Sequence, residues 1–597
     1  MDRILDKMIG FRRKNVNLRA SLPVFVILLL AACAQPVVKD EAGKKFSAPA
    51  AVEPESDSRT LSVQPVPTQE QLTAPLLYGM LLGEIAGQRG RLDVSGASYL
   101  EAARQSNDPR IAERALKISV YAKKPQLALQ AARRWVELAP SNLEARQSLA
   151  VLALRTDNQQ EALEQFEYLL QQSQGEGSDP YQSLLALMAR EPDQQRALEM
   201  MKQLVALRPQ DPEAHFAYAR LAVHAKNQPL AEQEVERSLQ LRPDWTQALI
   251  LQAQIHLEQG RGELARQLLY AALQRKPKDA DLRLAYARLL VDLDDFDGAR
   301  AEYSTLLKQQ PDNGQVLYSL ALLALEANQL EEAQNFFEKL VALDYQTQQA
   351  YYYLGAIAEE QNNRSRALQW YQKVEQGDHW IEVQIRIARL EAQGNDVEAA
   401  RERLRKLRLG HPAQAQRLFL VEGDILTQLG RYQEAYTLYS QYLDTQPDDS
   451  EILYARALTA ENLDRLAAAE RDFRKVLQQD PDNARTLNAL GYTLADRTGR
   501  YEEALVYVQK AFDQTPDDPA VIDSMGWVLY RLGRLQEARD HLQKAYDMTE
   551  DGEIGAHLGE VMWTMGDKNA ARAVWDKARR DSPGNAVLEE TLRRLSP

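Results

Sequence analysis

Small apolar residues recur along this chain at a nearly constant interval. One series of fifteen alanines has gaps of 31 to 35 residues, a mean of about 34: Ala97, Ala128, Ala162, Ala197, Ala231, Ala265, Ala299, Ala333, Ala367, Ala400, Ala435, Ala469, Ala504, Ala538 and Ala571. A second small residue precedes many of them by about twelve positions: Ala219, Ala253, Ala287, Ala321, Gly355, Ala388, Gly423, Ala457, Gly491, Gly526 and Gly559. This pattern predicts a repeated helix-turn-helix unit, because paired small residues let two helices approach closely.

Other residue types follow the same interval and predict how each unit is filled and ended. Large apolar side chains near the small positions should fill the groove between the helices: Leu354, Tyr371, Leu490, Leu494, Met525, Leu529 and Leu542. Residues that tolerate left-handed backbone should end the first helix: Gly260, Asn328, Asn362, Gly430, Gly499, Gly533 and Gly566. Prolines twelve residues after many alanines, such as Pro447 and Pro516, should close each unit.

The C-terminal third carries the resemblance to a known family. The segments Leu490-Gly491-Tyr492 with Ala504, and Met525-Gly526-Trp527 with Ala538, resemble tetratricopeptide repeats. The expected fold is therefore all-α, a tetratricopeptide-repeat superhelical solenoid of about fifteen helical hairpins over residues 75–582. A capping helix over residues 583–597 should cover the last hairpin with Glu and Arg on its outer face. The first four hairpins and the one containing Ala400 depart most from the pattern.

The N-terminus has the features of an export signal. Six basic residues precede an apolar run of nine residues, Leu22 to Leu30, which is too short to span a bilayer. We therefore expect residues 1–32 to be a lipoprotein signal peptide. The segment Leu30-Ala31-Ala32-Cys33 resembles a bacterial lipobox, which implies acylation of Cys33; the alternative is a buried structural cysteine. Because Ala34 and Gln35 follow, similarity to other lipoproteins implies an outer-membrane, lipid-anchored protein that faces the periplasm.

Residues 33–74 should form the acylated Cys and a disordered tether. They are rich in Pro, Ala, Ser, Glu, Asp and Gln and lack a helical period. The full chain has 72 Lys and Arg against 86 Asp and Glu, a net charge of −14, and loss of residues 1–32 makes this −18 because six basic and two acidic residues are removed. The basic stripe of a nucleic-acid-binding protein is missing, so we expect no nucleic-acid partner.

Motifs for catalysis or metal binding are not found in the sequence. The seven histidines have no metal-ligand spacing: His215, His224, His256, His379, His411, His541 and His557. The chain has no His-Glu-x-x-His motif, nucleophile elbow or phosphate-binding glycine loop. We therefore expect no enzyme activity, no catalytic residue, no metal and no cofactor.

The last three hairpins contain the candidate partner-binding site. Helical phase, counted from the small packing residue, places one set of aromatic and polar residues on the inner helix face: Asn488, Tyr492, Asp523, Trp527, Tyr530, Glu560 and Trp563. Large aromatic residues beside carboxylates and an amide are typical of an interface anchor. The alternative is that Trp527 and Trp563 fill the groove between neighbouring inner helices.

The whole layout resembles outer-membrane tetratricopeptide lipoproteins of Gram-negative bacteria, and among them the adaptors of the periplasmic carboxyl-terminal processing protease of pseudomonads. This resemblance implies a non-enzymatic adaptor that binds the protease and delivers peptidoglycan hydrolases to it for degradation. One alternative is a structural scaffold for an envelope assembly, such as a polysaccharide-export, pilus or cell-wall synthase complex. The other is an enzyme whose site the motif search does not recognise.

Overall fold

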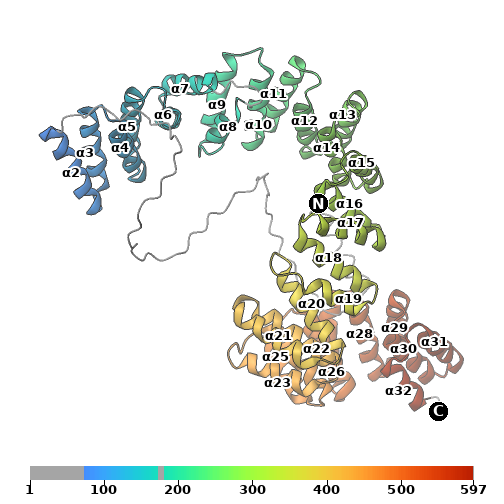
Figure 1. Cartoon of the computed structure of the whole chain (residues 1–597). Helices are drawn as coiled ribbons and strands as arrows, with labels where there is room; N and C mark the ends of the chain where they lie inside the picture. Colours follow the sequence, from blue (N-terminus) through green and yellow to red (C-terminus); the bar gives the residue numbers. More distant parts are fainter. Residues whose placement is uncertain (1–72, 173–179, 596–597) are drawn as a thin grey trace, which may run out of the picture. The chain divides into compact units, whose positions relative to one another are not determined.

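The structure, a computed structural model, describes residues 73–172 and 180–595 (Figure 1). Within these ranges every regular element is a helix, as the sequence pattern predicts. The signal peptide of residues 1–32, the lipidation at Cys33 and the tether up to residue 72 lie outside the described residues. The chain divides into two compact units, Met1–Gln329 and Leu330–Pro597.

The helices follow one another through short turns. Those of the first unit are α2 (Ala74–Gln88), α3 (Leu92–Arg104), α4 (Pro109–Tyr121), α5 (Pro125–Leu138), α6 (Leu143–Arg155), α7 (Gln159–Gln172), α8 (Gln182–Met188), α9 (Gln194–Ala206), α10 (Pro212–His224), α11 (Gln228–Leu241), α12 (Thr246–Glu258), α13 (Gly262–Arg275), α14 (Ala280–Asp292), α15 (Phe296–Gln309) and α16 (Gly314–Glu326). Those of the second unit are α17 (Leu330–Ala342), α18 (Thr347–Glu360), α19 (Arg364–Tyr371), α20 (Trp380–Gln393), α21 (Val397–Gly410), α22 (Ala415–Gln428), α23 (Tyr432–Leu443), α24 (Ser450–Asn462), α25 (Leu466–Gln479), α26 (Ala484–Arg497), α27 (Tyr501–Gln514), α28 (Pro519–Arg531), α29 (Leu535–Thr549), α30 (Gly552–Thr564), α31 (Lys568–Asp581) and α32 (Ala586–Leu595).

In chain order, α2 to α31 make fifteen helix pairs, and α32 lies within the range predicted for the closing helix. The predicted turn residues have positive φ, from 56° at Asn328 and Asn362 to 92° at Gly566. Where the sequence offers neither Gly nor Asn, residues such as Lys123 and Asp464 adopt the same left-handed conformation. The turn geometry is therefore kept even where a side chain makes it cost about 1–2 kcal/mol.

The recurring alanines lie in the second helix of each pair, and all but one are at most 1% exposed. The exception is Ala97, which is exposed, so its prediction as a packing residue is wrong. Ser95 occupies the packing position of the first pair and donates a 2.6 Å hydrogen bond from Oγ to the carbonyl oxygen of Gly83. Gly83 precedes Ser95 by twelve residues, as expected, but the alanine pattern placed this hairpin two residues too late.

Glycines in the first helix of several pairs face a large side chain sixteen residues further along. Tyr371 packs on Gly355, Leu542 on Gly526 and Trp575 on Gly559, and an added Cβ at any of these glycines would overlap its partner. Tyr371, Leu542 and Trp575 are at most 1% exposed. The absence of a side chain on one helix therefore makes room for a ring or branched side chain on the next.

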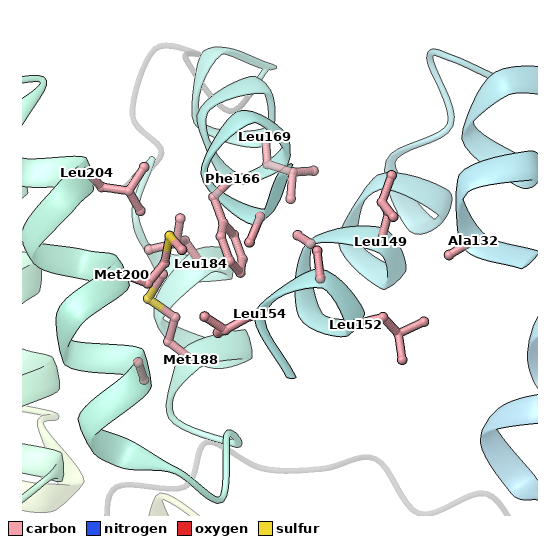
Figure 2. Close-up of a cluster of buried hydrophobic side chains, with 14 of the residues drawn as sticks. Ala132, Leu149, Leu152, Leu154, Phe166, Leu169, Leu184, Met188, Met200 and Leu204 are labelled. Atoms are coloured by element: carbon pink, nitrogen blue, oxygen red, sulfur yellow. The ribbon is translucent and has the colours of Figure 1, made fainter. Parts of the chain in front are cut away.

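Helix α8 is only seven residues long, and its packing shows why the early hairpins depart from the pattern. Figure 2 shows Leu184 and Met188 of α8 grouped with Phe166 of α7 and with Met200 and Leu204 of α9. All five side chains are at most 2% exposed. Flexible methionines fill the space that a longer helix would occupy, because an unbranched side chain adapts to irregular gaps.

A pair of Gly→Ala substitutions tests the close helix contact. A Cβ at Gly526 would lie 2.5 Å from Cγ of Leu542 and 3.1 Å from the carbonyl oxygen of Ala538, whereas a Cβ at Gly410, also helical, meets no atom within 4 Å. We expect Gly526→Ala to lower the free energy of unfolding by about 1–3 kcal/mol, and Gly410→Ala to raise it by roughly 0.5 kcal/mol. Denaturant unfolding of both variants checks this.

Hydrogen exchange on the same variants locates the damage. Gly526→Ala should lose protection first in α28, α29 and the hairpins next to them, because a solenoid is held by contacts between neighbours. Equal destabilisation by the two substitutions, or a uniform loss of protection over the whole chain, would contradict this account of the packing.

Candidate functional site

The predicted site residues lie on neighbouring first helices of the last three hairpins. Helix α26 carries Asn488 and Tyr492, α28 carries Asp523, Trp527 and Tyr530, and α30 carries Glu560 and Trp563. Helix α26 contacts α28, α28 contacts α30, and the closing helix α32 packs on α30. The repeat thus brings together residues up to 75 positions apart in the sequence.

Each of these three helices begins after a side chain that caps its free amides. Asn483 accepts a hydrogen bond from the N–H of Thr486, Asp518 from that of Ala520, and Asp551 from that of Glu553. Such caps typically stabilise a helix start by about 1 kcal/mol. They fix the first turns of α26, α28 and α30, and thereby the register in which the site residues face one another.

The site residues differ in how far they are exposed. Asp523, Trp527 and Glu560 are only 6%, 5% and 3% exposed, so they are buried between the helices. The other four, Asn488, Tyr492, Tyr530 and Trp563, are half-buried. For Trp527 the structure therefore agrees with the alternative of a groove-filling residue. Direct contact with a partner is open to the four half-buried side chains.

A buried histidine, which the sequence analysis did not place in the site, joins these residues. His557 of α30 is 2% exposed, and its Nδ1 lies 2.9 Å from Oδ1 of Asp523. Its ring stacks on Trp527 with a centroid distance of 4.1 Å. The Tyr492 hydroxyl lies 3.5 Å from Nε2 of His557 and donates a 3.2 Å hydrogen bond to Glu553. His557 thereby connects α26, α28 and α30.

The signal for His557 was its distance from Asp523. The two residues are 34 positions apart, one repeat length, so equivalent faces of α28 and α30 bring them together. The helical phase used for prediction selected the residue after Gly559 and those three before or four after it. His557 lies two before Gly559 and was therefore omitted.

The charge state of His557 is set by opposing effects. Burial by itself lowers the pKa of an imidazole, since it disfavours the cation. The Asp523 carboxylate, through its charge and its hydrogen bond, and the Glu553 and Asp496 carboxylates nearby outweigh this, and the pKa of His557 is raised above its usual value. A buried imidazolium paired with a carboxylate is a strong, directional link between α30 and α28.

A second polar group secures the C-terminal end of the site. The Tyr530 hydroxyl donates a 3.2 Å hydrogen bond to Oε1 of Glu560, and Nη2 of Arg594 donates a 2.5 Å hydrogen bond to Oε2 of the same carboxylate. Glu560 therefore ties α30 to both α28 and α32. Trp563 packs on Trp575 with a centroid distance of 5.5 Å, and Lys568 lies 4.8 Å from its ring centroid.

The network continues towards α24 through a buried carboxyl group. Burial raises the pKa of Glu461 to about 7, although the Thr493 hydroxyl donates a hydrogen bond to it. Asp496 accepts a 3.1 Å hydrogen bond from Nε1 of Trp527. Ionisable groups with shifted pKa values thus lie along the same row of first helices.

The geometry is that of a structural and binding site. Among residues 73–172 and 180–595, no cluster of three or more His, Cys, Asp or Glu could hold a metal ion. The Nε2 of His557 faces a phenol instead of a Ser or Cys nucleophile. Oδ1 of Asn488 is buried and has no hydrogen-bond donor within the described part of the chain. None of the described helices is both long and apolar enough to cross a bilayer.

Known proteins resemble this chain over most of its length. Family models described as tetratricopeptide repeat match residues 193–247, 256–323, 294–358, 385–450, 450–483 and 482–551. A TPR repeat-containing protein of Pseudomonas aeruginosa is 34% identical over 520 residues, which cover 87% of this chain and 88% of that protein.

Two solved structures match shorter parts of the chain. A thermophilic TPR protein of Thermus thermophilus is 27% identical, with a TM-score of 0.28, and the match covers 30% of this chain and 98% of that one. The pilF protein of Pseudomonas aeruginosa is 22% identical, with a TM-score of 0.27, and the match covers 31% of this chain and 84% of that one.

The raised pKa of His557 predicts a pH dependence of stability. A histidine whose pKa is higher in the folded than in the unfolded chain contributes stability that is fully present below about pH 6.5 and is lost as the pH rises through the folded value. In Asp523→Asn the amide no longer favours the imidazolium. We therefore expect the stability difference between wild type and Asp523→Asn to shrink as the pH rises above 6.5.

Unfolding free energies of the two proteins between pH 5 and pH 9 check this prediction. The difference between them separates His557 from Glu461, whose raised pKa also lowers stability with rising pH but is common to both proteins. A difference that stays constant or grows with pH would show that His557 is not held as a cation by Asp523.

Proposed function

The chain belongs to the tetratricopeptide-repeat family, whose repeats form protein–protein interaction scaffolds, and we propose that it is a non-enzymatic adaptor. In this proposal it is anchored in the outer membrane and faces the periplasm. There it binds a carboxyl-terminal processing protease and delivers peptidoglycan hydrolases to it for degradation. The observation that carries the binding role is the row of half-buried aromatic and amide side chains on α26, α28 and α30.

These side chains have the properties of a protein-binding surface. Tyr492, Tyr530 and Trp563 are held in place by hydrogen bonds or ring packing, so a partner would not have to pay for ordering them. Asn488 offers a carbonyl oxygen that still lacks a donor within the described residues. An extended peptide could supply a backbone N–H to this oxygen while its side chains pack on the aromatic edges.

The sequence layout supports the delivery role. A lipid on Cys33 followed by about forty residues of tether would confine a stack of protein-binding hairpins to the membrane surface. Two partners held on one scaffold meet with an effective concentration that can reach the millimolar range. An adaptor of this kind accelerates proteolysis without a catalytic residue of its own.

Capture from a bacterial envelope extract, followed by reconstitution, tests the proposal. The acylated protein should retain a serine protease of the carboxyl-terminal processing type together with peptidoglycan hydrolases. When the purified components are mixed, the hydrolase should be degraded faster with the protein than without it. Capture of polysaccharide-export, pilus or synthase components in their place would support the envelope scaffold. Hydrolysis by the purified protein alone would support an enzyme.

Substitutions at the half-buried residues test the site. We expect Asn488→Ala combined with Trp563→Ala to weaken protease or hydrolase binding by about thirtyfold or more, since loss of an aromatic anchor often costs more than about 2 kcal/mol. Val506→Ala is the control, because Val506 is 55% exposed on the second helix α27. Binding is measured by interferometry. Trp527→Ala with Tyr530→Ala is less informative, because Trp527 is buried and its loss should lower stability.

Normal affinity of the Asn488 and Trp563 variant, together with an unchanged melting temperature, would move the binding site elsewhere on the solenoid.

The lipid anchor is tested separately. We expect Cys33→Ser to leave folding intact and to release the protein from the outer-membrane fraction, because the described fold begins forty residues later. Membrane fractionation and circular dichroism measure the two effects. Retention of Cys33→Ser in the outer membrane of a strain that lacks the partners would contradict lipidation at this residue.

A further inference from the structure

The first helix of the described fold presents an apolar face that no other described element covers. On α2, Leu77, Tyr78, Leu81, Leu82 and Ile85 are 43%, 68%, 53%, 37% and 46% exposed. At 100° per residue they span roughly 140° of the helix circumference. With roughly 200 Å² per large side chain, these fractions leave about 500 Å² of apolar surface open, the size of a patch that often has a function.

Helix α2 is unusual in having little polar surface. Its only charged residue is Glu84, which lies beside the exposed face, 3.5 Å from Arg114 of α4. The opposite side of α2 is buried against α3 through residues such as Leu76 and Gly83. A helix that is apolar on nearly all sides is normally covered on all sides. We refer to the five exposed residues as the α2 face.

The charge around the α2 face is opposite to that of the chain. Residues 73–138, the first two hairpins, contain ten Lys and Arg against six Asp and Glu, a net charge of +4 in a chain of net charge −14. Arg89 and Arg91 follow directly after α2, and Lys123 and Lys124 follow α4 at the equivalent turn. Val120 and Tyr121, 52% and 79% exposed, add apolar surface beside these lysines.

We propose that the α2 face and the basic turns beside it bind a phospholipid bilayer with anionic headgroups. Leucine, isoleucine and tyrosine side chains enter the boundary between headgroups and acyl chains, while Arg89, Arg91, Lys123 and Lys124 contact lipid phosphates. The proposal rests on the proposed lipid attachment only for its place in the cell: acylated Cys33 would keep α2, forty residues away, close to the bilayer.

A second copy of the chain fits the α2 face less well than a bilayer. Two such faces of about 500 Å² would bury about 1,000 Å² in total, which is at the lower limit for a specific interface. The same contact would also bring two hairpin pairs of charge +4 together. An anionic bilayer, in contrast, matches both the apolar side chains and the charge.

Flotation with vesicles tests the proposal without the lipid anchor. The chain from Ala34 to Pro597 lacks Cys33 but keeps every described helix. It is mixed with vesicles of phosphatidylethanolamine and phosphatidylglycerol in about 0.1 M salt, where charges are screened beyond roughly 10 Å. We expect it to float with these vesicles, and less so with neutral vesicles or at 1 M salt, because the basic turns contribute to binding.

A matched pair of variants identifies the binding face. Leu81→Glu with Ile85→Glu should lower the vesicle partition coefficient about tenfold or more, since it removes two inserting side chains and adds two charges. Leu264→Glu with Tyr270→Glu places the same charges at two residues of α13 that are 47% and 50% exposed, and should bind like the unmodified chain. Arg89→Ser with Arg91→Ser leaves the α2 face intact and should weaken both the binding and its salt dependence.

Several results would overturn the proposal. One is that the unmodified chain does not float with anionic vesicles. Another is that the α2 variant and the α13 variant bind equally well. If the chain sediments as a dimer that Leu81→Glu with Ile85→Glu converts to a monomer, without any flotation, the α2 face is a self-association surface. Circular dichroism shows whether the α2 variant folds, and if it does not, the Arg89 and Arg91 variant decides. None of these results depends on protease binding, so the adaptor proposal can fail separately.

Discussion

The close approach of two helices at a pair of small residues is the contact on which this fold depends. An alanine that is almost fully buried lies in the second helix of each pair, and a glycine or alanine on the first helix faces it or a neighbouring side chain. Where the first-helix residue is glycine, the space takes a residue as large as Tyr371 or Trp575. One hairpin then presents a shape that the next hairpin can cover, and the contact is repeated about every 34 residues.

This contact uses only part of each first helix, and the remaining face is free to carry other chemistry. In the last three hairpins that face holds His557, Asp523 and Glu560, which link α26, α28, α30 and α32 by charged hydrogen bonds. Such links are directional, so they fix the rotation of one helix relative to the next more strictly than apolar packing does. The half-buried rings of Tyr492 and Trp563 are thereby held at fixed positions.

Much of the fold follows from local sequence, because each hairpin is defined by residues within one repeat. The alanine series, the turn residues and the closing helix are of this kind, and they were predictable. Ala97 was misplaced because Ser95 meets the same steric need, so residue size and not residue type carries the signal. The burial of Trp527 and the role of His557 depend on how α28 meets α30, a contact between repeats that a single-repeat pattern does not contain.

The first and last helices of the described chain solve the same problem in different ways. Both are terminal, so each has one side that no following or preceding hairpin covers. Helix α32 closes its end with charged residues, of which Arg594 pairs with Glu560 and Arg579 of α31 pairs with Glu589. Helix α2 has only one charged residue and exposes five large apolar side chains. An end that is polar needs nothing further to remain in water. An apolar end, adjacent to basic turns, is stable only if something that is itself apolar and negatively charged covers it, which is the physical basis for assigning it to a lipid surface.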